Sequence, residues 1–337
     1  MPRSTHRQYV LVGMVVVIAI LGVSYNAFFR NNNSSDGRKT YRIAVVSLVE
    51  IEPIVQLRAG FRERLEGSEF ATTHELAFTD YNAQGDNALV NQIVDKLAVD
   101  PPDLVFVLGT PAAQAIQKRI PEVLLVQGAV TDPIAAGLAR SWDGSGRKYL
   151  ATSDLPPVEE QIKLIRLLTP ATTRVGIVYN SGEVNSVAVV SRFRDQAPRV
   201  QLPLKLVERQ VDNTAGVATA VQSLVGNVDV IYLPPDNTVF AAVKVVGKFA
   251  NENRIPIFAS ARPAIEGGAL ATLSLDYKEL GKESADLALA ALAGRDPATT
   301  PIRLNQSPQI TISAKVARLV NVDLAPVRNN PRYTIVE

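Results

Sequence analysis

The sequence predicts an α/β protein with two lobes, each built around a mostly parallel sheet. Short apolar runs alternate with segments that carry apolar residues at helical spacing, a pattern typical of strands joined by helical crossovers. This alternation runs to about residue 152 and then starts again. A chain of 337 residues also suits two domains of roughly 100–200 residues each.

The clearest repeating unit lies at residues 230–239. The apolar run Val230–Leu233 ends at Pro234 and Pro235, and Asp236-Asn237-Thr238 then precedes a helical pattern. Buried parallel strands are near-continuous apolar runs, and Asp, Asn or Thr before an apolar-periodic segment indicates a helix start. The loop therefore lies at the carboxyl end of a strand, where open α/β sheets bind ligands.

The first lobe follows the same rhythm. Helical patterns at residues 54–65, 86–97 and after Thr110 separate the apolar runs. Strands separated by helices of this length imply right-handed crossovers and a parallel sheet, which together make a doubly wound unit. The expected strands are residues 41–49, 74–81, 103–108, 123–130 and 149–152.

The second lobe is predicted to begin with a helix that Ser153 and Asp154 would cap, with Pro156, Pro157 and two acids in its first turn. In the tail, residues 277–292 form a strong helical pattern, and we expect the chain to cross between lobes near residues 152, 260 and 293. Residues 41–152 and 260–292 would then form the first lobe, and 153–259 and 293–337 the second. The expected strands of the second lobe are residues 174–179, 202–207, 229–233 and 255–260, and the tail adds expected strands at residues 268–275 and 309–314.

Residues 1–40 are predicted to be a membrane anchor or signal segment with a polar linker. Arg3 and Arg7 precede residues 9–29, which contain no charged side chain. About 20 apolar residues span a bilayer, whereas a signal peptide has a shorter apolar region and a cleavage site of small residues. We favour an uncleaved transmembrane helix that places the rest of the chain outside the cytoplasm. The alternative, cleavage near residues 22–24, would give a secreted or periplasmic protein.

The composition excludes most common enzyme chemistries. There is no cysteine, and His6 and His74 are the only histidines, which leaves little for zinc binding or for His-based catalysis. Common nucleotide-binding, hydrolase and metalloprotease motifs are absent. The net charge of +2 does not indicate nucleic acid as a partner. We therefore predict a protein that is not an enzyme and that holds no cofactor or metal.

Four polar clusters follow predicted strands, at residues 110–114, 131–132, 180–186 and 236–238. A helix N-terminus suits a carboxylate and an unpaired acid suits an ammonium group, so a zwitterionic amino acid satisfies both. The alternative for each cluster is helix capping, which stabilises by about 1 kcal/mol without a ligand. For Asp132 the alternative to ligand binding is a role in a turn before Pro133. For Glu183 the alternative is a charge exposed to solvent.

Seven segments, in order along residues 41–315, closely resemble the tryptophan/tyrosine-type substrate-binding proteins of ABC importers. They are Asn82 to Asp86, Thr110 to Gln114, Ala129 to Leu138, Ser153 to Gln161, Tyr179 to Ser186, Pro235 to Val239 and Ala269 to Gly281.

The resemblance implies a type I periplasmic-binding-protein fold, with two lobes joined by a three-crossing hinge and a ligand held between them. Characterised members bind aromatic amino acids, so it implies a small-molecule ligand of that kind and an ABC permease with its ATPase as partners. The alternative function is a sensor ectodomain that signals to a membrane partner. Glu50-Ile51-Glu52 stands where the family often has Glu-His-Pro, which leaves the exact ligand open.

The resemblance also suggests that Thr110 and nearby backbone hold the ligand carboxylate, with Asn180, Asp236 and Asn237 on the facing lobe. The full set of candidate ligand-binding residues is Asn82, Gln84, Thr110, Ala112, Gln114, Thr131, Asp132, Ser153, Asn180, Glu183, Asn185, Ser186, Asp236, Asn237, Thr238 and Asp276.

Overall fold

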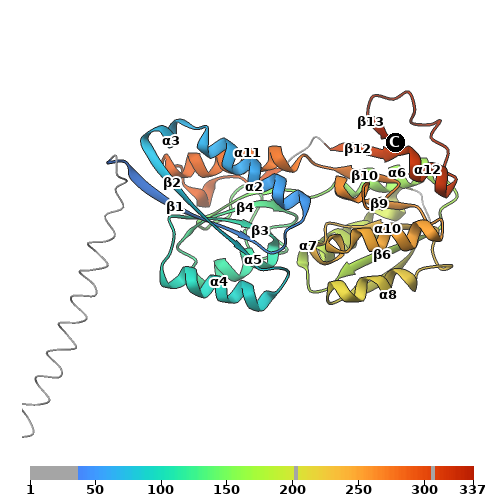
Figure 1. Ribbon diagram of the computed structural model, residues 1–337, viewed down its shortest axis with the longest axis horizontal. Helices are drawn as coiled ribbons and strands as arrows, with labels where there is room; N and C mark the ends of the chain where they lie inside the picture. Colours follow the sequence, from blue (N-terminus) through green and yellow to red (C-terminus); the bar gives the residue numbers. More distant parts are fainter. Residues whose placement is uncertain (1–36, 201–203, 305–307) are drawn as a thin grey trace, which may run out of the picture.

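Two α/β lobes lie side by side along the long axis of the molecule (Figure 1). The computed structural model describes residues 37–200, 204–304 and 308–337. Each lobe has one sheet with helices on both faces, and all but one of the strand pairs within these residues are parallel. The predicted pair of parallel-sheet lobes is confirmed.

The first lobe has the strand order β11-β5-β4-β3-β1-β2. Helices α2 and α11 cover one face of this sheet, and α4 and α5 cover the other (Figure 1). Its elements are β1 (Lys39–Ser47), α2 (Glu52–Glu66), α3 (Glu69–Thr73), β2 (His74–Asn82), α4 (Asn87–Val99), β3 (Leu104–Leu108), α5 (Thr110–Arg119), β4 (Leu124–Val130), β5 (Tyr149–Ser153), α11 (Tyr277–Leu292) and β11 (Arg303–Leu304).

The second lobe has the strand order β13-β12-β10-β9-β8-β6-β7, in which β10 and β12 are antiparallel. Its elements are α6 (Val158–Leu168), β6 (Arg174–Asn180), α7 (Val184–Gln196), β7 (Lys205–Val211), α8 (Val217–Gln222), β8 (Val230–Leu233), α9 (Asn237–Ala241), α10 (Val243–Glu252), β9 (Ile257–Ala259), β10 (Ala271–Ser274), β12 (Gln309–Ser313), α12 (Ala314–Val320) and β13 (Tyr333–Val336).

Helices α2 and α11 pack with almost no space between their backbones. A Cβ atom on Gly281 would lie 2.1 Å from the carbonyl oxygen of Leu57, and one on Gly60 would lie 2.0 Å from that of Lys278. Only glycine permits this approach. The contact fixes the first turn of α11, and with it Tyr277, relative to the first turn of α2.

The chain passes between the two sheets three times, but two passages differ from the predicted positions. Strand β10 pairs with β9 and β12 in the second sheet, so residues 260–274 do not belong to the first lobe as predicted. Strand β11 pairs with β5 in the first sheet, so the return to the second lobe follows residue 304 rather than residue 293. Helical periodicity indicates that α11 buries one face, but it does not indicate which sheet covers that face.

The predicted cap of α6 is also wrong. The helix begins at Val158 after Pro157, which offers no side-chain cap. Ser153 instead accepts a hydrogen bond from the Leu155 N–H at 3.1 Å, and Asp154 lies in the cleft between the lobes. Pro156 and Pro157 separate Asp154 from the start of α6 at Val158, so its side chain does not cap this helix.

The predicted membrane segment at residues 9–29 lies outside the described residues. Across residues 37–200, 204–304 and 308–337, none of the helices is both long enough and apolar enough to span a bilayer.

Candidate functional site

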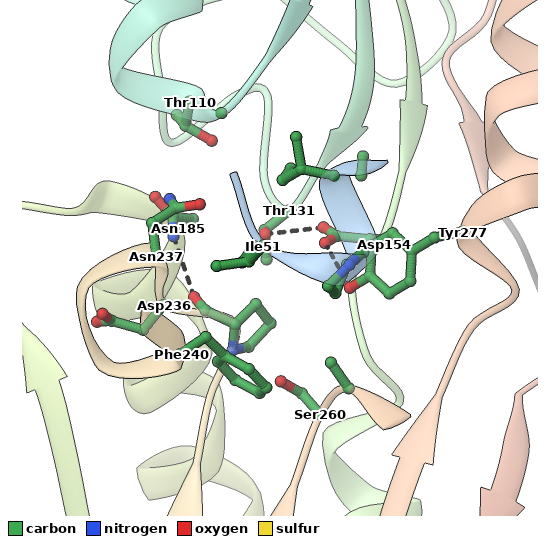
Figure 2. A pocket seen from close by; sticks show the side chains of 16 residues that line it. Ile51, Thr110, Thr131, Asp154, Asn185, Asp236, Asn237, Phe240, Ser260 and Tyr277 are labelled. Carbon is green, nitrogen blue, oxygen red and sulfur yellow. Dashed lines mark hydrogen bonds between the residues drawn. The ribbon is translucent and has the colours of Figure 1, made fainter. Parts of the chain in front are cut away.

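A cavity lies between the lobes, where loops from the carboxyl ends of both sheets meet (Figure 2). Residues from both sheets and from the chain passages between them form its wall. The lining residues are Ile51, Pro53, Ile54, Gly109, Thr110, Ala129, Thr131, Asp154, Asn185, Pro235, Asp236, Asn237, Phe240, Ser260, Ala261 and Tyr277.

The first lobe presents an uncapped helix N-terminus to this cavity. Helix α5 begins at Thr110, and its N-cap is Gly109, which has no side chain to bond the first N–H groups. Gly109 has φ 113°, and a Cβ there would lie 2.9 Å from Leu48 Cβ, so this turn requires glycine. The first amides of a helix carry partial positive charge. The cavity therefore has an anion-binding position beside Thr110, which is itself 5% exposed.

A buried carboxylate, Asp154, lies elsewhere on the wall of the same cavity. One of its oxygens accepts a hydrogen bond from the Thr131 hydroxyl at 2.8 Å, and the other accepts one from the Tyr277 hydroxyl at 3.2 Å (Figure 2). Burial raises the pKa of Asp154 to about 6 from 3.8, even though both hydrogen bonds lower it. No cation within the described residues pairs with Asp154, so a positively charged ligand group would stabilise its ionised form.

The second lobe presents a helix N-terminus whose amides are already bonded. The Asp236 carboxylate caps α9 by accepting from the Val239 N–H at 2.8 Å. Glu183 accepts from the backbone N–H groups of Asn237 and Thr238, both at 3.0 Å. It also accepts from three side chains, those of Asn185, Asn237 and Thr238. The N-terminus of α9 therefore has no free amide for a ligand anion, in contrast to α5.

Asp236 braces the loops of the second lobe against each other. Its second oxygen accepts from the Asn180 N–H at 2.6 Å and from the Ser186 hydroxyl at 2.7 Å. Burial, and then repulsion from the Glu183 carboxylate, raise the pKa of Asp236 to about 7. Both carboxylates hold this wall together. Asp236 accepts three hydrogen bonds and Glu183 five, whereas Asp154 accepts two from side chains.

The remaining wall is apolar except for Ser260. Ile51, Pro53 and Ile54 come from the start of α2, and Pro235 and Phe240 face them from the second lobe. Figure 2 shows Phe240 at one end of the cavity and Thr110 at the other. The cavity thus combines an anion-binding position, a buried acid and an apolar end. Among the residues that the structure describes, no cluster of three or more His, Cys, Asp or Glu side chains is placed to hold a metal ion.

The structure brings five of the sixteen predicted site residues to this cavity, namely Thr110, Thr131, Asn185, Asp236 and Asn237. Four others, Gln84, Asn180, Glu183 and Thr238, line an adjoining depression between the lobes.

The other seven predicted residues have local partners or lie elsewhere. Asp132 lines a third depression, beside α7. Asn82 accepts from the Gln84 N–H, Gln114 donates to the Ala136 carbonyl, Asp276 caps α11, and Ala112 is buried. Ser153 and Ser186 bond within the loops described above. Ligand contact by all sixteen residues stays a prediction.

Sequence reasoning did not select Asp154, Tyr277, Phe240 or Ser260. The signal for Asp154 was present, because an acid that follows a strand and precedes two prolines is badly placed to cap a helix. Glu183 was a candidate, but the solvated charge that we considered for it is wrong, since its side chain is buried at 4% exposure. Its donors come from residues about 50 positions further along the chain, which no local pattern reveals.

One ion pair joins the two lobes at the edge of the cleft. Arg192 of α7 donates to Asp132 of the first lobe at 3.0 Å. The other oxygen of Asp132 accepts from the Ile134 and Ala135 N–H groups, which holds the carboxylate in place. Among the described residues, no other ion pair connects the lobes.

Most of the chain also matches the model of a known protein family. The model of the family described as ABC transporter substrate binding protein matches residues 42–325. The chain belongs to this family. The resemblance seen in the sequence motifs is thereby confirmed, and ABC substrate-binding proteins act outside the cytoplasm.

Similar proteins include members that bind aromatic amino acids. This substrate-binding protein is 31% identical over 316 residues to a tyrosine-binding protein of Clostridioides difficile, covering 93% of this chain and 91% of the relative. It is 27% identical to a Streptococcus pneumoniae domain in complex with L-Trp, with a TM-score of 0.81 and coverage of 85% and 96%.

A ligand-free, open structure of a substrate-binding protein with adhesive properties from Clostridium difficile is 30% identical, and coverage is 88% of this chain and 99% of that one. Its TM-score to this structure is 0.67. At comparable sequence identity, the structure of this substrate-binding protein therefore superimposes better on the tryptophan complex than on the open structure.

Proposed function

We propose that this protein captures an aromatic amino acid between its lobes and delivers it to the permease of an ABC importer. The observation that carries the proposal is that one cavity holds an uncapped helix N-terminus, a buried acid and an apolar end. An amino acid has one group for each of these three environments.

The ligand carboxylate would lie at the N-terminus of α5, beside Thr110. The N–H groups of Thr110 and Ala112 have no capping side chain, and a helix N-terminus favours an anion by both its dipole and its free donors. Asp236 and Glu183 fill the corresponding position of the second lobe with negative charge, so a ligand carboxylate would be repelled there.

The ligand ammonium group would pair with Asp154. Thr131 and Tyr277 hold this carboxylate by one hydrogen bond each and leave lone pairs for a third donor. The aromatic ring would then lie among Ile51, Pro53 and Phe240, where ring contacts and burial of apolar area add affinity.

Binding to both lobes would favour the closed arrangement. A ligand shifts a conformational equilibrium only through contacts that differ between the two states. The greater likeness to the tryptophan complex than to the open relative and the ion pair between Arg192 and Asp132 both support a closed cleft. Family membership favours transport over the sensor alternative.

The test is thermal unfolding of the full-length chain with each of the twenty amino acids. A ligand at 100 times its dissociation constant stabilises by about 2.7 kcal/mol. We expect a rise in the unfolding temperature with tryptophan, tyrosine or phenylalanine and none with aspartate or lysine. Folded, ligand-free protein that responds to no aromatic amino acid would refute the proposal.

A further inference from the structure

Two polar atoms of the cavity residues in the second lobe have no hydrogen-bond partner. They are the Ser260 hydroxyl oxygen and the Asn185 side-chain oxygen, in residues that are 4% and 5% exposed. The Asn185 amide nitrogen, in contrast, donates to Glu183 and to the Pro235 carbonyl. Buried polar atoms are normally paired, so an unpaired one in a binding cavity calls for an explanation.

Ser260 is held rigidly at the apolar end of the cavity. It directly follows β9, and its backbone N–H donates to the Leu233 carbonyl of the neighbouring strand at 3.1 Å. Figure 2 shows its hydroxyl directed into the cavity near Phe240. The hydroxyl therefore lies where the proposed function places the aromatic ring, and away from Thr110.

We propose that Ser260 determines specificity by bonding a polar atom on the ligand's ring. The inference rests on the proposed function. A serine hydroxyl can accept from an indole N–H or exchange a hydrogen bond with a phenol O–H. A phenylalanine ring would offer this hydroxyl no hydrogen-bond partner, and a buried polar group without a partner is unfavourable. The cavity should therefore prefer tyrosine or tryptophan to phenylalanine.

The experiment measures the affinity of the full-length chain for L-tyrosine, L-tryptophan and L-phenylalanine by isothermal titration calorimetry. For wild type we expect tyrosine or tryptophan to bind more tightly than phenylalanine. Ser260→Ala should weaken the preferred ligand by about 3- to 10-fold, the range of one neutral hydrogen bond, and leave phenylalanine unchanged or slightly improved.

Ser47→Ala is the matched control, because the Ser47 hydroxyl is also buried and unpaired but does not line the cavity. It should change none of the three affinities. Equal wild-type affinities, or an Ser260→Ala effect that is absent or the same for all three ligands, would overturn the inference and leave the proposed function standing. Absence of binding by all three would overturn both.

Discussion

Replacing Asp154 by asparagine should make the protein more stable and weaken its binding of the ligand. Burial raises the pKa of Asp154 from 3.8 to about 6, so the folded protein resists its ionisation. At pH 8 the carboxyl group is ionised in both the folded and the unfolded chain, and the whole difference counts against folding. A difference of about 2 pKa units corresponds to roughly 3 kcal/mol.

The net gain is smaller than this figure. The Thr131 and Tyr277 hydroxyls donate to different oxygens of Asp154, and asparagine keeps an oxygen at only one of these two positions. One hydroxyl therefore loses its acceptor, and one lost hydrogen bond costs about 1 kcal/mol. We expect Asp154→Asn to raise the free energy of unfolding by about 2 kcal/mol at pH 8. The gain should shrink as the pH falls towards 4, because the folded wild type then takes up the proton that relieves the penalty.

Ligand binding should change in the opposite direction. The proposed ammonium group would lose a buried charged partner, which typically costs 2–5 kcal/mol, or at least about 30-fold in affinity. Urea unfolding at pH 8, 6 and 4 measures the first effect, and calorimetric titration with L-tryptophan and L-tyrosine measures the second.

Asp86→Asn provides the matched control. Asp86 caps α4 outside the cavity, and asparagine caps about as well as aspartate, so neither stability nor affinity should change much. An Asp154→Asn protein that is less stable than wild type at pH 8 would refute the desolvation argument. One that binds as tightly as wild type would refute the role of Asp154 in the site.

Three further predictions test the site and its support. The affinity of wild type for its amino acid should fall below pH about 6, by up to about tenfold per pH unit. The reason is that Asp154, with its raised pKa, takes up a proton that the ligand ammonium group must displace. Titrations between pH 5 and 8 should show this slope, and Asp154→Asn should lack it. Arg192→Ala should weaken binding about 2- to 5-fold although Arg192 does not line the cavity, because the substitution removes the partly exposed ion pair between the lobes. A loss of affinity that stays the same in 1 M NaCl would contradict an electrostatic cause. Gly281→Ala should lower the free energy of unfolding by about 1–3 kcal/mol or more, because its Cβ would meet the Leu57 carbonyl at 2.1 Å. The control is Gly216→Ala, whose Cβ would have no neighbouring atom nearer than 3.8 Å. Urea unfolding should show little change in the stability of this control.

Local sequence patterns predicted most of the strands and the loops at their carboxyl ends. Buried parallel strands are continuous apolar runs, so β3, β6 and β8 lie where the sequence indicated. The assignment of β10 and β11 to sheets could not be predicted in this way. It is set by pairings with strands that lie apart in the sequence, such as β11 with β5, and such pairings leave no local pattern.

The same distinction separates the residues of the site. Thr110 and Thr131 could be predicted, because polar residues after buried strands converge at one edge of a sheet. The role of Glu183 could not, since it has the local pattern of a surface acid. For Asp154 the two prolines that follow argue against a helix cap, but they do not indicate what else the carboxylate contacts. Their environments depend on Tyr277 and on the N-terminus of α9, which the fold brings to them from distant parts of the chain.

The two lobes contribute different kinds of contact to the cavity, and this difference has a consequence for ligand choice. The first lobe and its passage to the second offer the free amides at Thr110 and the carboxylate of Asp154, which suit the groups that all amino acids share. In the second lobe, Glu183 and Asp236 use the amides of α9. Among the described residues that this lobe contributes to the cavity, the buried polar atoms without a partner are those of Ser260 and Asn185. Changes at Thr110 or Asp154 should therefore weaken all amino acid ligands together, whereas changes at Ser260 should alter their order.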